Sequence, residues 1–144
     1  MRLSSASIAA VALLFGFQSA VADDKSAVVT WETLAQVSVT RQKDRYVPEF
    51  SKQILALDKR EVKLKGFMMP LEPGMAQKHF LLSAQPPDCA FCMPGTAEQF
   101  AEVLAKVPVK VPSDAIVVSG TFSLVRDDSG GLLYRLTEAV VVNN

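Results

Sequence analysis

The sequence predicts a mainly β fold (α+β), a small OB-like Greek-key barrel, with a curled antiparallel sheet packed by one helix as the competing architecture. Three observations predict it. Residues 61–68, 79–82, 115–125 and 132–142 carry apolar residues as strands do. One stretch, residues 97–104, has apolar residues at helical spacing. A parallel α/β sheet is not predicted, because one helix cannot serve several crossovers.

The first 22 residues predict a secretory signal peptide. A basic start at Arg2 precedes an apolar run over residues 8–17, and a small-x-small pattern ends at Ala22, where we expect cleavage. The apolar run is too short to cross a bilayer, and no second run approaches the roughly 20 residues required. We therefore expect a periplasmic protein with no integral membrane segment after cleavage.

Composition is typical of one globular domain, with 144 residues, 49% hydrophobic and 21% charged. The whole chain has 15 basic and 15 acidic residues, so loss of Arg2 leaves a formal charge near −1. Basic residues are interleaved with acidic ones and form no stripe. The sequence therefore predicts no nucleic-acid partner.

The front of the expected mature chain, residues 23–56, is predicted to cover a barrel domain formed by residues 57–144. Residues 30–34 predict a short capped helical turn, with Trp31 as a packing anchor. Residues 47–50 are interpreted as a turn.

The barrel domain is expected to begin with a half-buried strand at residues 61–68, where polar and apolar residues alternate with period two. Gly66 within it predicts a bulge or bend, because a missing side chain weakens a straight strand. Another strand follows at residues 79–82. The chain is expected to close with a hairpin of residues 115–125 and 132–142 around the turn DDSGG.

Between these strands, residues 96–99 match a capping box, which predicts the start of a helix. Apolar residues continue at helical spacing: Ala97, Phe100, Ala101 and Leu104. We expect one helix of about three turns. Residues 107–112 predict a short edge strand, which Pro108 and Pro112 would blunt.

Both cysteines of the chain lie in the stretch PPDCAFCMPG, as Cys89 and Cys92. One tetrahedral ion can bridge two thiolates at this spacing, as in half-sites of structural zinc centres. Zinc would need further ligands, and His79 is the one histidine of the sequence. We therefore take Cys89, Cys92 and His79 as candidate zinc ligands. His79 is expected to point away from the core, because Phe80 and Leu82 form the fully apolar side of its strand.

Methionines suggest copper as the alternative to zinc. Apart from Met1, all of them lie within residues 68–93, which also hold the cysteines and the histidine. Thioethers together with thiolates suit Cu(I), so Met68 and Met93 are candidates for additional, softer ligands. The alternative interpretation is that Met68 or Met69 fills the core, since the two alternate faces and one must point inward, while Met93 covers the loop.

Two other interpretations of the cysteines stay open. In an oxidising compartment the thiols would pair, and this short disulfide would restrain a partner-binding loop of a non-enzymatic interaction module. The third interpretation is a thiol-disulfide protein. It has less support, because residues 93–95 separate Cys92 from the expected helix and no thioredoxin-like framework surrounds the motif. No nucleophile–base arrangement or phosphate-binding loop is present in the sequence, so an enzyme is not predicted.

Three stretches in this order, LDKREVKLKGFMMPL, KHFLLS and PPDCAFCMPG, resemble an uncharacterised family of exported bacterial proteins catalogued as domain of unknown function 3299. The likeness runs from Trp31 to the final strand. The resemblance implies an OB-like barrel and a periplasmic accessory role in metal handling, zinc in particular. We therefore expect a metal-binding or metal-trafficking accessory protein. Its expected partner is a metal transport system or another periplasmic protein.

Overall fold

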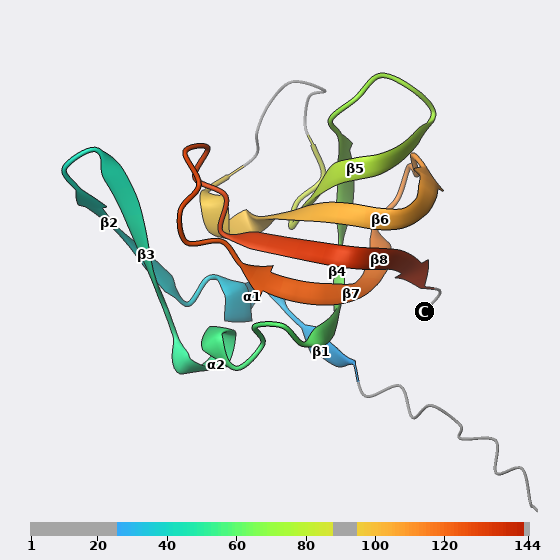
Figure 1. Ribbon diagram of the computed structural model, residues 1–144. Coiled ribbons are helices and arrows are strands. Elements are labelled where there is room, and N and C mark those ends of the chain that lie inside the picture. The colour runs from blue at the N-terminus through green and yellow to red at the C-terminus, as the bar shows by residue number, and fades with distance from the viewer. Residues whose placement is uncertain (1–25, 88–94, 143–144) are drawn as a thin grey trace, which may run out of the picture.

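Five strands close a barrel in the computed structural model, which describes residues 26–87 and 95–142 (Figure 1). They are β4 (Glu61–Pro70), β5 (Ala76–Ser83), β6 (Phe100–Lys110), β7 (Ile116–Leu124) and β8 (Tyr134–Val142). The strand order is β4-β5-β6-β8-β7, and β7 pairs back with β4. β6 and β8 are parallel, and the other barrel pairs are antiparallel. The predicted OB-like barrel is confirmed, as is the closing β7–β8 hairpin.

A smaller set of elements precedes the barrel: β1 (Ala27–Val29), α1 (Trp31–Leu34), β2 (Val37–Gln42), β3 (Arg45–Phe50) and α2 (Lys52–Leu55). β1 pairs in parallel with β4, while β2 and β3 form a hairpin of their own that projects from the barrel (Figure 1). Among the described residues no helix is long and apolar enough to cross a membrane. The predicted signal peptide lies outside the described residues.

Two predictions for this front segment have different outcomes. The short helical turn is confirmed, since the Thr30 side chain caps α1 by accepting a hydrogen bond from the Thr33 N–H. The turn predicted at residues 47–50 is wrong, because these residues lie in β3. Pro48 suggested a turn, but proline is also tolerated in edge strands, and β3 is an edge strand of a two-stranded sheet.

Gly66 marks the point where β4 changes partner. Residues Glu61 to Gly66 pair with β7, and Phe67 to Pro70 pair with β5. A Cβ atom at Gly66 would lie 2.6 Å from the backbone oxygen of Ser83 and 2.8 Å from Cγ of Leu82. The bulge or bend predicted at Gly66 thus falls where β4 changes partner and where β5 approaches too closely for a side chain.

The helix predicted after the cysteine motif is wrong. A single 3-10 turn, η1 (Ala97–Gln99), is followed directly by β6. The capping box does not form, because the Thr96 hydroxyl bonds to the Glu98 carboxylate and caps no backbone N–H. The stretch also contains apolar residues at strand spacing, and pairing with β5 and β8 buries Ala101 and Val103 at alternate positions. Residues 107–110 of the predicted separate edge strand are instead the end of β6, and residues 111–112 follow it outside any strand.

The front segment is tied to the barrel by buried contacts. Leu34 of α1 and Ile54 of α2 are fully buried in the same core as Phe122 and Tyr134. The Tyr134 hydroxyl donates to the backbone oxygen of Leu34 at 2.6 Å, and burial raises the pKa of Tyr134, so the hydroxyl keeps its proton. The predicted anchor Trp31 packs against this core and donates from Nε1 to the Lys65 oxygen at 2.7 Å.

Replacement of Gly66 by alanine should lower the free energy of unfolding by about 2 kcal/mol, because the new Cβ would overlap the backbone of β5. Urea denaturation would measure the change. Gly130→Ala is the control, since its Cβ would meet the carboxylate of an exposed loop residue, Asp128, at 3.0 Å. Equal midpoints for Gly66→Ala and the parent protein would contradict this account of the bend.

Candidate functional site

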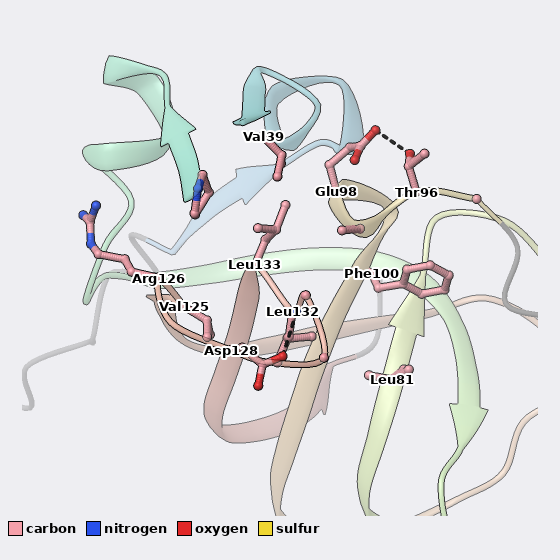
Figure 2. A pocket seen from close by; sticks show the side chains of 15 residues that line it. Val39, Leu81, Thr96, Glu98, Phe100, Val125, Arg126, Asp128, Leu132 and Leu133 are labelled. Atoms are coloured by element: carbon pink, nitrogen blue, oxygen red, sulfur yellow. Dashed lines mark hydrogen bonds between the residues drawn. The ribbon is translucent and has the colours of Figure 1, made fainter. Parts of the chain in front are cut away.

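A pocket of about 560 Å³ opens between the β2–β3 hairpin, η1 and the β7–β8 loop (Figure 2). Most of its lining is apolar. The apolar side chains are Val39, Pro48, Leu81, Ala97, Phe100, Val125, Leu132 and Leu133. Such a concave apolar surface is typical of ligand sites, which measure roughly 300–1,000 Å³.

The hairpin supplies one wall through its register. Val37 pairs with Phe50 and Val39 with Pro48, so these four side chains share one face of the two-stranded sheet. Val37 and Phe50, nearest the barrel, pack against the core. Val39 and Pro48, the next pair outward, line the pocket, and Val39 is 42% exposed. The apolar face of the hairpin therefore extends beyond the core into the pocket.

The β7–β8 loop supplies the opposite wall. Asp128 fixes this loop, because its Oδ2 accepts from the Leu132 N–H at 2.9 Å and its backbone oxygen accepts from the Gly131 N–H at 3.1 Å. Gly131 has φ +79, a left-handed conformation that favours glycine. The Val125 N–H closes the base of the loop on the Leu133 oxygen at 2.9 Å. Leu132 and Leu133 are thereby held in the lining (Figure 2).

Charged groups stand at the mouth of the pocket. Arg126 lies at the rim and extends away from the aliphatic wall, with its guanidinium carbon 5.5 Å from the ring centroid of Phe50 (Figure 2). Arg45 near the hairpin turn lies 4.0 Å from Asp127 of the β7–β8 loop, Nη1 to Oδ2. Both partners are largely exposed, so this ion pair contributes little to stability.

His79 forms a polar network on the outer face of the same sheet. Phe80 and Leu82 are fully buried and the His79 side chain is 40% exposed, so the prediction that His79 points away from the core is confirmed. Its Nε2 lies 2.8 Å from Oε1 of Glu102, and Oε2 of Glu102 accepts from Nε of Arg135. The network joins β5, β6 and β8.

Glu102 is ionised in this network. Burial of its carboxyl raises the pKa, but the hydrogen bonds from Arg135 and His79 outweigh that effect, and the pKa of Glu102 lies below its ordinary value. The sequence interpretation missed Glu102 and Arg135. It placed Glu102 on a helix, and nothing in the local sequence shows that β8 lies beside β6.

Among the described residues, none of the other predicted ligands lies beside His79. Met68 is 6% exposed and pairs with Leu82, so it faces the core, on the opposite face of the sheet from His79. This is the core position that the alternative interpretation gave it. Cys89, Cys92 and Met93 lie outside the described residues. Within residues 26–87 and 95–142 no group of three or more histidine, cysteine, aspartate or glutamate residues could hold a metal ion.

Comparisons with known proteins give a family and a fold. The model of the family described as protein of unknown function DUF3299 matches residues 17–141. A crystal structure of a DUF3299 family protein from Pseudomonas aeruginosa PAO1 is similar, with a TM-score of 0.59 and 21% sequence identity. The match covers 83% of this chain and 97% of that chain. No curated protein matches the sequence.

The Glu102 network should make stability depend on pH. Because the pKa of Glu102 is lower in the folded state, its contribution is present above the unfolded pKa of about 4.3 and is lost as the pH falls through the folded value. Glu102→Gln should therefore lower the free energy of unfolding by about 1 kcal/mol at neutral pH, and by less in acid. Urea denaturation at several pH values would measure this.

Glu49→Gln, on the exposed face of β3, is the matched control and should follow the parent protein at every pH. A loss for Glu102→Gln that is the same at neutral pH and in strong acid would show that the ionised network does not stabilise the fold.

Proposed function

The chain belongs to the DUF3299 family, and we propose that it is a non-enzymatic binding module that takes an apolar ligand into the pocket between the β2–β3 hairpin and the barrel. The observation that carries the proposal is the pocket itself, about 560 Å³ of mostly aliphatic surface. Soluble proteins rarely leave such a surface open unless something binds there.

The polar groups of the lining support binding of an apolar molecule. The Thr96 hydroxyl and the Glu98 carboxylate bond to each other, and the Asp128 carboxylate is occupied by the Leu132 N–H. These groups are already partnered, so the pocket interior offers contact area more than hydrogen bonds. Among the described lining residues there is neither histidine nor lysine to act as a base, which favours binding over catalysis.

The position of the pocket on the barrel also supports a binding role. OB barrels hold ligands on the outer face of their second and third strands and with the loop between the fourth and fifth. Here β5 and β6 are the second and third strands and supply Leu81 and Phe100, while the β7–β8 loop is the last one. This argument rests on analogy between folds. In the sequence, Gly95 of the lining is the last residue of the stretch PPDCAFCMPG, and Thr96 directly follows it.

A second candidate function is the metal handling that the cysteine motif suggests. A histidine that ligates a metal usually has its other ring nitrogen bonded to a carboxylate. His79 has this arrangement, because Nε2 contacts Glu102, and Nδ1 is the nitrogen left to bind an ion. In this proposal Cys89 and Cys92 supply thiolates to zinc, or to copper with Met93 as a softer ligand. The partner would be a metal transport system or another exported protein.

An aspartate in the pocket should weaken binding of an apolar probe. Val39→Asp places a charge on the hairpin wall, and it should weaken binding of the neutral dye Nile red at least tenfold, measured by fluorescence titration. Val28→Asp is the matched control, because Val28 is 77% exposed and is not part of the lining. A parent protein that does not bind the dye, or equal binding by both variants, would contradict the proposed pocket function.

The metal candidate predicts about one equivalent of zinc or copper per chain after export and purification without added metal or reductant. The metal should be lost in Cys89→Ser, and Glu102→Gln should weaken zinc binding roughly tenfold or more. Met75→Leu is the control, since Met75 is exposed and is not a predicted ligand.

Free thiols measured on the same sample separate the cysteine interpretations. A metal-free protein with both thiols oxidised and resistant to mild reductant would contradict metal binding and favour a structural disulfide. Oxidation that a mild reductant readily reverses would favour a thiol-disulfide protein.

A further inference from the structure

We propose that the ligand of the apolar pocket is a linear aliphatic molecule with a carboxylate at one end. Its chain would lie between the hairpin and the β7–β8 loop, and its carboxylate would lie at the mouth beside Arg126. This inference rests on the proposed binding function and deepens it by naming the ligand class.

The shape and chemistry of the walls favour an aliphatic body. Val39 and Leu132 come from opposite sides of the pocket and both carry branched aliphatic side chains (Figure 2). Phe100 is the one aromatic side chain in the described lining, and it is 3% exposed, so it offers little face for stacking a planar ligand. Contact with such walls is non-directional and grows with the apolar area removed from water.

The position of Arg126 favours an anionic end at the mouth. The described lining holds two carboxylates, Glu98 and Asp128, which bond to neutral groups, so a ligand carboxylate is favoured only beside the Arg126 guanidinium. Arg126 differs from them, because among the described residues it contacts the Phe50 ring and has no carboxylate within ion-pair distance. Its guanidinium is therefore available to a ligand.

A second arginine stands on the hairpin side. Arg41 follows Val39 by two residues in β2, so it lies on the same face of the hairpin, one pair further out. Its Nε donates to the backbone oxygen of Lys43 at 3.4 Å, which leaves the other guanidinium donors. A guanidinium binds a carboxylate through two parallel hydrogen bonds, and the planar fork matches a carboxylate better than a hydroxyl.

Binding of dodecanoic acid and of dodecanol, measured by displacement of Nile red from the full chain, would test the proposal. The two molecules share the aliphatic chain and differ at the end group. We expect the acid to bind about fivefold more tightly than the alcohol at low salt, because rim charges contribute modestly. At about 1 M salt, where the screening length is about 3 Å, this preference should disappear.

The double variant Arg41→Gln/Arg126→Gln should bind the acid as weakly as the alcohol. Arg60→Gln is the matched control, because Arg60 is exposed and lies outside the pocket lining. Urea denaturation of each variant would show that it is folded.

Three results would overturn the inference. Equal binding of acid and alcohol by the parent protein would contradict a ligand with a carboxylate end, but it would not contradict the proposed pocket function. An acid preference that survives in the double variant would assign the charge recognition to other groups. Failure of the parent protein to bind Nile red, the acid or the alcohol would overturn the inference together with the pocket function.

Discussion

The fold depends on one strand that pairs with two neighbours in succession. β4 runs beside β7 up to Gly66 and beside β5 after it, and this change of partner closes the sheet into a barrel. A Cβ atom at Gly66 would lie 2.6 Å from the Ser83 backbone oxygen, so closure with any larger residue there would be strained. The closed order places the start of β6 and the loop before β8 beside each other, at one end of the barrel (Figure 1). Both segments line the pocket.

The closed barrel alone would leave the pocket without one of its walls. The hairpin supplies it, and buried groups on both sides of the hairpin hold it in place. Leu34 and Ile54 flank it in the chain and sit in the barrel core. The Tyr134 hydroxyl binds the Leu34 oxygen, and the Tyr134 ring lies between Phe50, at 6.0 Å, and Phe122, at 5.5 Å, measured between centroids. One tyrosine thus joins the last barrel strand to the root of the hairpin.

Local patterns predicted the parts of the fold that local chemistry decides. Period-two alternation located β4, β5 and the closing hairpin, and Thr30 located the short helix. The pattern failed at β6, because residues 97–104 include a helical spacing while Ala101, Val103 and Ala105 also have strand spacing, and only the neighbouring strands decide between the two. It failed at β3 because Pro48 has the same chemistry in a turn and in an edge strand.

The candidate site was less predictable than the fold. The neighbouring residues in the sequence were enough to assign His79 to the outer face. Glu102 and Arg135 join His79 in a network only through strand pairing, which no local pattern shows. The described lining of the pocket comes from the hairpin, β5, residues 95–100 and residues 125–133, which lie far apart in the sequence, and it was not predicted. The two ends of the hairpin are held to the barrel by different contacts. Its root is locked by Phe50, while its far end reaches the barrel through a solvent-exposed contact between Arg45 and Asp127. We therefore expect the far end of the hairpin to move more readily than its root.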